Sequence, residues 1–268
     1  MLTATGRVQG DWIRDLRGEF LFNDNLSNSN RSSDQRDDFA VAGQAHFGRF
    51  DEITDHLRLT MTADLDAQAF ASYEDFNRLF LGSTASLRYR FGFGAMAPFV
   101  RVEASGGYAN FEQNLRDGGR YRAGITAGKR ITERLAIEAS YVFEDIGGQI
   151  RVFDQRSNSF ALTASFDLTQ TTRLTAGYEF RDGEVVSYAV PPRPDIVALA
   201  NARRTVATFG PPYVAYNLDA VTHSLQIGVS QALTPSISIS ARYEWQQTSR
   251  AQLDYQNNLL RLSVHAAF

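Results

Sequence analysis

A His–Ser pair is the arrangement in this chain that comes closest to a catalytic site. The four histidines are His46, His56, His223 and His265, and only His223 is followed by a serine, Ser224. A serine nucleophile needs a histidine within hydrogen-bond distance. Both residues begin a segment that alternates in polarity, and neighbouring side chains on a strand point to opposite faces. The two side chains should therefore diverge, so the sequence predicts that the protein is not an enzyme.

Metal ligation has one candidate, a group of aspartates in a polar stretch. Asp34, Asp37 and Asp38 lie beside Arg31 and Arg36, and the chain has no cysteine. Carboxylates at this spacing could hold calcium or bridge divalent cations to phosphates, and the alternative is a solvated loop without metal. The ordered ligand pattern of an EF-hand is missing, and no two histidines lie at a ligand spacing. No metal or other cofactor is predicted.

Arginine supplies nearly all of the positive charge. Lys129 is the only lysine among 27 basic residues, and the net charge is −3. Nucleic-acid binding needs a clustered positive excess, so no nucleic-acid partner is expected. The arginines instead recur at alternate positions, as in Arg88 and Arg90 or Arg120 and Arg122. Their chemistry therefore depends on the elements that position them.

Alternation of apolar and polar residues with a period of two runs along most of the chain. Leu57, Leu59 and Met61, for example, alternate with Arg58 and Thr60. This period places the two kinds of side chain on opposite faces of a β-strand. The pattern predicts an all-β fold with strands at 16–25, 36–49, 56–68, 78–91, 97–112, 119–131, 134–146, 157–168, 172–187, 219–232, 236–249 and 257–268.

The lengths of strands and connections favour a membrane barrel. Many predicted strands have 11 to 16 residues, whereas soluble strands average about 5–6 and a tilted membrane strand needs about 9–11. Short connections alternate with longer ones, as periplasmic turns alternate with extracellular loops. The sequence predicts a transmembrane antiparallel up-and-down β-barrel, a single domain over residues 1–268. A soluble sandwich or lipocalin-like barrel is the alternative. The short connections are 50–55, 92–96, 132–133, 169–171 and 233–235, and the longer ones are 26–35, 69–77, 113–118, 147–156, 188–218 and 250–256.

One face of each predicted strand is apolar and often ends in aromatic residues. Phe39 and Phe47 lie at the two ends of one strand, and Tyr243 and Trp245 close another. Aromatic rings at the borders of an apolar band are typical of membrane interfaces. The mean hydropathy is only −0.29, and no run of about 18 apolar residues predicts a transmembrane helix. This face is therefore predicted to meet lipid.

The opposite face carries charged residues, which a barrel directs into its lumen. We predict that the pore is lined by Arg58, Arg88, Arg90, Arg101, Glu103, Arg120, Arg122, Arg134, Glu138, Arg173, Glu179, Arg181, Arg242 and Glu244. The same face carries Asp64, Asp66, Arg130, Glu144, Arg261 and His265. Arginines outnumber carboxylates 12 to 7 in this set, which favours anions. Such charges either line a water-filled channel or pair as a salt-bridged filling. Arg88, Arg90, Arg120 and Arg122 are expected to form one cluster on neighbouring strands.

The longest predicted loop, 188–218, holds five of the seven prolines, and residues 195–200 within it predict a short helix. Loops of this length are usually functional or disordered. If the loop folds into the lumen as a constriction, Arg203 and Arg204 could face carboxylates such as Glu138 and Glu179. A mobile surface loop is the alternative.

The last predicted strand resembles the C-terminal strand of Gram-negative outer-membrane β-barrels. Val264 and Ala266 alternate up to the terminal Phe268. The resemblance implies recognition of Phe268 by the barrel-assembly machinery. In addition, residues 22–25, followed by 37–39, are similar to the first loop of porin-like barrels found beside exopolysaccharide genes and in repeat-fused barrels.

The strand count depends on the N-terminus. Residues 1–5 lack the charged and apolar regions of a signal peptide. With the C-terminus in the periplasm and an even number of strands, 16–25 is the first of twelve, and 1–13 is a periplasmic lead. The alternative uses 2–12 as an extra strand, giving fourteen strands if the N-terminus is truncated.

The favoured function is an outer-membrane pore for small hydrophilic solutes, with anions favoured by the arginine excess. The alternatives are the barrel domain of a secretion or export system for polysaccharide or protein, and a structural or adhesive barrel with a blocked lumen. The expected partners are outer-membrane lipid and lipopolysaccharide, the barrel-assembly machinery and, for the export system, a periplasmic or export partner. The expected location is the outer membrane of a Gram-negative bacterium.

Overall fold

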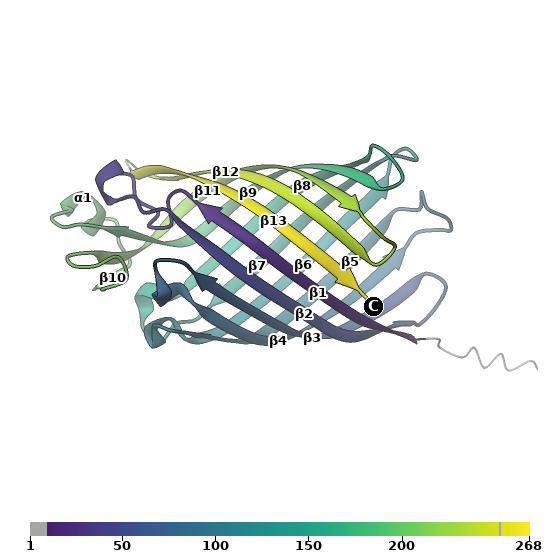
Figure 1. The fold of residues 1–268 in the computed structure, drawn as a ribbon, viewed down its shortest axis with the longest axis horizontal. Helices are drawn as coiled ribbons and strands as arrows, with labels where there is room; N and C mark the ends of the chain where they lie inside the picture. The colour runs from purple at the N-terminus through teal and green to yellow at the C-terminus, as the bar shows by residue number, and fades with distance from the viewer. Residues whose placement is uncertain (1–9, 252) are drawn as a thin grey trace, which may run out of the picture.

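The computed structural model describes residues 10–251 and 253–268 and is a closed antiparallel β-barrel (Figure 1). Each wall strand pairs with the next, and β1 pairs with β13 to close a ring of twelve. The wall consists of β1 (Gly10–Asn23), β2 (Asp38–Glu52), β3 (Leu57–Phe70), β4 (Arg78–Arg90), β5 (Phe99–Phe111), β6 (Gly118–Arg130), β7 (Leu135–Ile146), β8 (Gln155–Asp167), β9 (Thr172–Ala189), β11 (Val214–Ala232), β12 (Ile237–Arg250) and β13 (Leu253–Ala267). Helix α1 (Pro194–Val197) and strand β10 (Ala202–Thr205), which pairs with β11, lie between β9 and β11.

The prediction of twelve strands is confirmed, but the first strand begins earlier than expected. Pairing with β2 extends to Gly10, which lies opposite Asp51. Residues 10–13 therefore belong to the wall, and the prediction that they form a lead is wrong. The remainder of that lead, residues 1–9, lies outside the described residues. Because β1 pairs with β2 on one edge and with β13 on the other, the ring needs no further strand.

Four connections at one end of the barrel each contain a 3-10 helix. These helices are η1 (Ser32–Asp34), η2 (Glu74–Phe76), η3 (Asn114–Arg116) and η4 (Arg151–Phe153), which follow β1, β3, β5 and β7. We call this end the long-loop end, and it is the extracellular one by the usual rule for such barrels. The opposite, short-turn end carries the C-terminus (Figure 1).

The prediction that short connections lie at one end of the barrel and longer ones at the other is wrong in two places. The β12–β13 connection at the long-loop end has only two residues, 251–252. The β4–β5 connection at the short-turn end spans 91–98 and is as long as the β7–β8 loop, 147–154. The polar residues at 250–256 predict a loop, but the hydrogen-bonded pairing of β12 with β13 extends as far as Arg250 and Leu253.

The outer wall of the barrel is apolar. Leu81, Leu162 and Ile227 are 60%, 54% and 63% exposed on three different strands. A continuous exposed apolar surface of this kind is a membrane-contact surface. No helix in the described part of the chain is long and apolar enough to cross a membrane.

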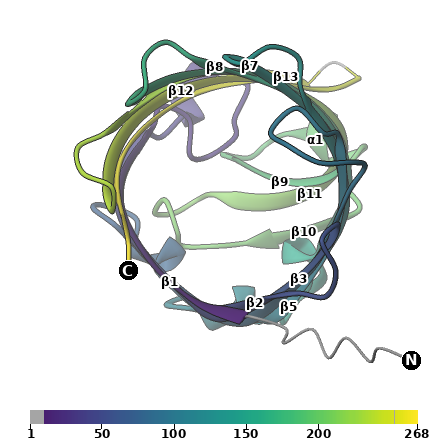
Figure 2. The same ribbon diagram turned by 90° about the vertical axis from the view of Figure 1, so that its right-hand side faces the viewer.

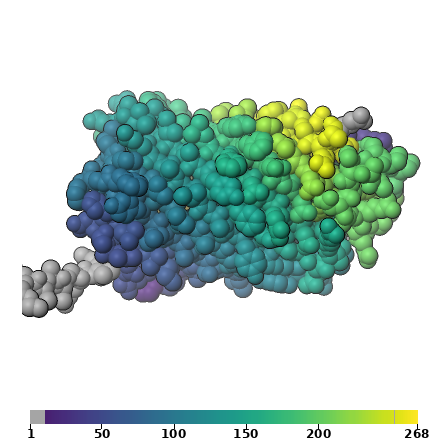
Figure 3. All heavy atoms as spheres, turned by 180° about the vertical axis from the view of Figure 1, so that it is seen from behind, coloured from purple at the N-terminus to yellow at the C-terminus, as the bar shows by residue number. Residues whose placement is uncertain are grey.

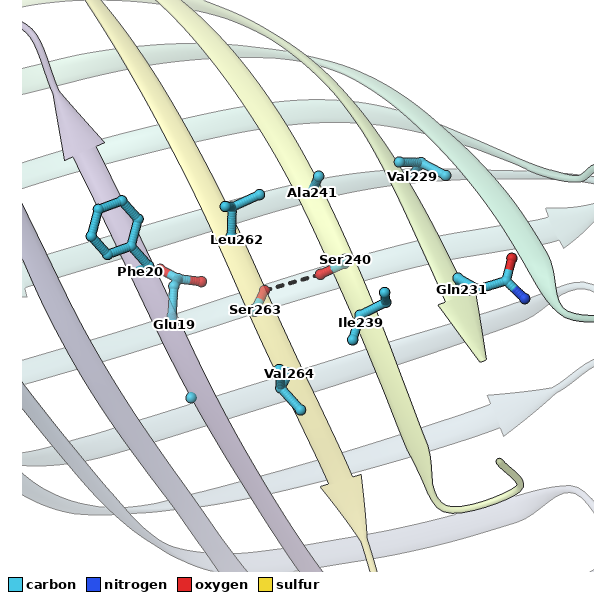
Figure 4. Close-up of a pocket in the computed structure, with 11 residues that line it drawn as sticks. Glu19, Phe20, Val229, Gln231, Ile239, Ser240, Ala241, Leu262, Ser263 and Val264 are labelled. Atoms are coloured by element: carbon cyan, nitrogen blue, oxygen red, sulfur yellow. Dashed lines mark hydrogen bonds between the residues drawn. The ribbon is translucent and has the colours of Figure 1, made fainter. Parts of the chain in front are cut away.

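A hollow of about 540 Å³ across β1, β13, β12 and β11 shows how the two faces alternate (Figure 4). Phe20, Leu262 and Val229 line it on the outer side. Ser240 and Ser263 belong to the inner side and are joined by a hydrogen bond of 2.9 Å. Because the hollow is apolar and faces outward, we assign it to lipid contact.

Candidate channel lumen and its cap

The cross-strand register places the predicted pore-lining residues on the inner face of the wall, with one exception. Arg58, Arg88, Arg101 and Thr126 follow one another across four strands, and their chain neighbours Leu87, Val102 and Ile125 are exposed apolar residues of the outer wall. Arg134 is the exception, because it lies in the turn 131–134 rather than on a strand. The inner face holds Arg58, Arg88, Arg90, Arg101, Glu103, Arg120, Arg122, Glu138, Arg173, Glu179, Arg181, Arg242 and Glu244.

Several charged lumen residues were missing from the predicted set. Asp15, Arg17 and Glu19 alternate along β1, and Arg78 opens β4. His46 lies opposite Asp15 on β2. The same alternation marks all of them in the sequence, so the signal was present. These additions bring two arginines and two carboxylates, and Arg134 leaves the set, so the arginine excess in the lumen falls from five to four.

One ion-pair network crosses β12, β13 and β1 in the lumen. Arg261 lies 2.6 Å from Glu244 and 3.7 Å from Glu19, and Arg17 lies 2.7 Å from Glu19. Gln246 donates a further hydrogen bond of 2.7 Å to Glu244. In this sector Arg17, Arg261, Glu19 and Glu244 satisfy one another. Arg242, directly opposite Arg261, has no carboxylate oxygen within 4.0 Å in the described part of the chain.

A second set of polar contacts runs from β2 to β7. Asp64 accepts hydrogen bonds from Thr62 and Thr84 and lies 2.7 Å from His46. Elsewhere in this set, Arg78 lies 3.2 Å from Asp66, and Arg120 lies 2.7 Å from Glu144. The salt-bridged interpretation of the lumen therefore holds for these residues too.

The expected cluster of Arg88, Arg90, Arg120 and Arg122 does not exist, and that prediction is wrong. β4 and β6 both run from the long-loop end to the short-turn end. Arg88 and Arg90 end β4, whereas Arg120 and Arg122 begin β6. The two pairs therefore lie at opposite ends of the barrel.

Arginines at the short-turn end occur in two sectors that differ in their partners. In one sector, Arg130 and Arg173 lie 2.9 Å and 2.6 Å from the same carboxylate, Asp167. In the other, Arg58 and Arg88 lie opposite one another on β3 and β4, followed by Arg101 on β5. The second sector has more arginines, and their positive charge is balanced less completely by nearby carboxylates.

The long-loop end is covered by a segment that rises beyond the wall. Pairing of β8 with β9 ends at Gly183, and pairing of β11 with β12 begins at Val221. Residues 184–220, which we call the cap segment, therefore extend past the wall. They include the end of β9, α1, β10 and the start of β11. Viewed along the axis, these elements lie across the opening (Figure 2), and in space-filling view the light-green residues form that end of the molecule (Figure 3).

One face of the cap segment forms a hydrophobic core with the loops around it. Tyr188, Phe209 and Tyr213 are buried together with Val152 and Phe153 of the β7–β8 loop. Residues from the other three loops pack against this core, namely Leu26, Tyr73, Phe76 and Leu115. Because these loops come from separate hairpins, the core ties them together across the opening.

Arg116 on η3 belongs to the same core. Its guanidinium lies 4.2 Å from the ring centre of Phe76 and 4.4 Å from that of Phe153. It also donates a hydrogen bond to the hydroxyl of Tyr188. This arginine therefore joins two loops to the cap segment.

The other face of the cap segment contains a fully buried arginine. Arg193 donates to Asp195 at 2.9 Å and to Asn30 at 2.8 Å, and lies 3.9 Å from Asp34. The hydrogen bonds from Arg193 hold the pKa of Asp195 below its usual value. Because Asn30 and Asp34 belong to the β1–β2 loop, this contact also fastens the cap segment to the wall.

The structure places the predicted constriction residues away from the lumen carboxylates. Arg203 and Arg204 lie on β10, are exposed, and sit opposite Tyr216 and Ala215 of β11. Glu138 lies near the short-turn end of β7, at the other end of the barrel. The expected pairing of these arginines with Glu138 is therefore wrong. The predicted short helix is present as α1.

The two other candidate sites, the His–Ser pair and the group of aspartates, make structural contacts. His223 faces outward and hydrogen-bonds to Tyr178 at 2.7 Å, whereas Ser224 is buried on the inner face, so the two side chains diverge as expected. Asp34 accepts a hydrogen bond from the backbone of Val190, and Asp38 accepts hydrogen bonds from the backbones of Ser72 and Tyr73. Within the described ranges, no group of acidic or histidine residues could hold a metal ion.

Comparison with known proteins gives a fold and no sequence family. No family model matches the chain, and no curated protein matches it. An outer membrane channel from Pseudomonas putida F1 matches with a TM-score of 0.61 and 12% identity over all of both chains. The chain has the fold of outer-membrane channels. The deltaS2 mutant of the TodX monoaromatic hydrocarbon channel matches with a TM-score of 0.50 and 7% identity, covering 96% of this chain and 90% of that one. The NanC porin matches with a TM-score of 0.50 and 10% identity, covering 94% and 98%.

This fold agrees with the apolar outer wall. Together they place the protein in the outer membrane of a Gram-negative bacterium and confirm the resemblance drawn from its last strand. The similarity of residues 22–25 and 37–39 to one group of porin-like barrels stays a resemblance. In the structure, Asn25 is buried and hydrogen-bonds to the backbones of Ser29 and Gln256.

Proposed function

We propose that the protein is an outer-membrane pore for small hydrophilic solutes, with a preference for anions. The observation that carries this proposal is the lumen, where charged side chains keep access to water inside an apolar wall. The side chains of Arg58 and Arg101 are 42% and 40% exposed, and both face inward. Hydrated fixed charges in a narrow tube raise the local concentration of counter-ions.

The cap segment acts in this proposal as the barrier at the extracellular mouth. Its core joins loops from several hairpins, so solute passage from outside depends on displacement of residues 184–220. An export barrel for polysaccharide or protein would need a wide path at the same place. The cap segment therefore favours small solutes over a polymer.

A catalytic role has little support. The matching channels and porins are not described as enzymes, and His223 and Ser224 point to opposite sides of the wall. We further propose that Phe268, which continues the outward alternation of Val264 and Ala266, interacts with the barrel-assembly machinery.

Planar-bilayer recording tests the proposed function. The wild type is compared with a variant in which 184–219 are replaced by an Asn-Gly turn, which can join the paired positions Gly183 and Ala220. We expect discrete conductance from the wild type and a larger one from the variant. A matched control replaces the turn 233–236 at the opposite end, between β11 and β12, with an Asn-Gly turn and should leave the conductance unchanged. Failure of both the wild type and the cap variant to conduct, with both folded by heat-modifiable gel migration, would refute the pore.

A further inference from the structure

Three inward-facing arginines lie directly opposite one another at the short-turn end. Arg58 on β3 is paired in register with Arg88 on β4, which is paired with Arg101 on β5. Arg90 follows two residues after Arg88, on the same face. Like charges at directly opposed positions destabilise a sheet. The arrangement is therefore unfavourable unless negative charge, from carboxylates of the protein or from a bound anion, balances it.

Aromatic rings orient two of these arginines without neutralising them. The guanidinium of Arg58 lies 4.5 Å from the ring centre of Phe50, and that of Arg88 lies 3.8 Å from the ring centre of Phe99. A guanidinium against a ring keeps its charge and its N–H donors. These donors fit two oxygens of one carboxylate or phosphate.

Nearby carboxylates compensate the arginines only in part. Glu52 lies 2.6 Å from Arg58, and Glu103 lies 3.9 Å from Arg101. Glu138 of β7 acts on Arg88 electrostatically, and Asp55 lies in the neighbouring turn. Within the described ranges, neither Arg88 nor Arg90 has a carboxylate oxygen within 4.0 Å. These two arginines therefore carry the excess charge of the sector.

A small polar cavity adjoins this excess charge. It has a volume of about 160 Å³ and is lined by Arg58, Arg88, Arg90, Glu52 and the turn that carries Asp55 and His56. The Nδ1 atom of His56 is buried and has no hydrogen-bond partner in the described protein. The cavity therefore brings an unsatisfied polar atom close to the arginines.

We propose that Arg58, Arg88 and Arg90 form a binding site for a small oxyanion, a carboxylate or phosphate group, at the short-turn mouth of the barrel. The proposal rests on the proposed pore, because it names the solute class that the pore would favour. The site also makes the two ends of the pore functionally different, since it lies at the end opposite to the cap segment. A solute would meet it on the periplasmic side of the lumen.

Calorimetric titration of the detergent-purified full chain tests the site directly. Inorganic phosphate and succinate are titrated separately, with chloride as the background anion, and the tighter of the two identifies the group preferred. We expect saturable binding to the wild type. Arg88→Gln should weaken it roughly tenfold, as loss of one charge-assisted hydrogen bond would. Arg90→Gln is a second variant with the same expected direction, in case the first does not fold.

Arg130→Gln is the matched control. Arg130 lies at the same end, and its removal leaves Asp167 paired with Arg173 at 2.6 Å. We expect less than about a twofold change in affinity, since only the screened long-range field is altered. Equal weakening by Arg88→Gln and Arg130→Gln, or no binding to the wild type, would overturn the site. Conductance without oxyanion binding would overturn only the site, whereas oxyanion binding by a folded protein that never conducts would support the site and overturn the pore.

Discussion

Arg193 in the cap segment and the arginines of the short-turn mouth have opposite environments. At the long-loop end, the Arg193 side chain is 0% exposed and bonded to Asp195 and Asn30. At the short-turn end, the Arg58 side chain is 42% exposed, and Arg88 has an aromatic ring rather than an acid beneath it. Arg193 is therefore sealed from water inside the cap segment, whereas Arg58 presents its charge to the water of the lumen.

The difference shows how one wall can serve both closure and recognition. A buried guanidinium is tolerated only when it is paired with acidic or polar groups. Arg193 bonds to Asp195 and Asn30 through Nε and Nη2, and its Nη1 lies 3.9 Å from Asp34, so it fixes the position of these segments. A hydrated guanidinium pays little desolvation free energy, and its N–H donors stay available to a solute. The same residue type thus stabilises the cap segment at one mouth and attracts solute at the other.

The largest effect should come from removing an aromatic ring in the core of the cap segment. Tyr188 is 2% exposed and packs against Phe76 and Phe209. Tyr188→Ala should destabilise the cap segment by about 3–5 kcal/mol, the range for large aromatic truncations in cores. Hydrogen exchange should rise in 184–220 and not in the wall strands. Tyr121→Ala, at an outward position that is 63% exposed, is the control. Unchanged exchange in Tyr188→Ala would show that the cap is not held by this core.

The next effect concerns the wall between the two ends. Leu162 faces outward and is 54% exposed, whereas Thr163 lies on the inner face opposite Glu138. Leu162→Arg should cost about 2–4 kcal/mol of folding free energy near the bilayer midplane. Thr163→Arg should be tolerated, because it faces the lumen. Folding into liposomes, followed by urea titration, measures both. Equal costs would contradict the register on which the comparison of the two ends depends.

The smallest effect is a pH dependence of the cap segment. Because hydrogen bonds from Arg193 lower the pKa of Asp195 in the folded cap, its ionised form stabilises that fold. This contribution is complete above the ordinary aspartate pKa of about 3.9 and is lost as the pH falls through the lowered value. Open probability in bilayers should therefore rise below about pH 4. Asp195→Asn should flatten this part of the pH profile. An identical rise in that variant would assign the transition to other groups.

Much of the wall could be predicted because each strand has one lipid face and one lumen face. That constraint places Leu57 outside and Arg58 inside from sequence alone. The start of β1 was missed because the strand count, rather than the alternation, placed residues 1–13 outside the wall, and only the partners on β2 show that 10–13 belong to it. The opposite positions of Arg88 and Arg120 follow from strand direction, which the antiparallel order already implied.

The cap segment was harder to predict, because its contacts are long-range. Tyr188 meets Phe76 and Phe153 from loops more than thirty residues away in the chain. One signal was available, since Val185, Val186, Tyr188 and Ala189 are apolar on both faces of the strand. Strands that are buried on both faces have such nearly continuous apolar sequences. A lumen or lipid strand would have alternated.

Cysteine accessibility tests the central claim, that water reaches the lumen from the short-turn end and is blocked at the other. The chain has no cysteine, so single sites can be introduced cleanly. Ser105→Cys lies on the inner face of β5, and Ser83→Cys lies on the outer face of β4 one register position away. The reagent is a charged, membrane-impermeant methanethiosulfonate, added to either side of a bilayer that contains oriented protein.

We expect Ser105→Cys to react quickly from the short-turn side, and from the long-loop side only when residues 184–219 are replaced. Ser83→Cys should stay unmodified because it meets lipid. Equal reaction of Ser105→Cys from both sides of the intact barrel, or no reaction from the short-turn side, would contradict the account.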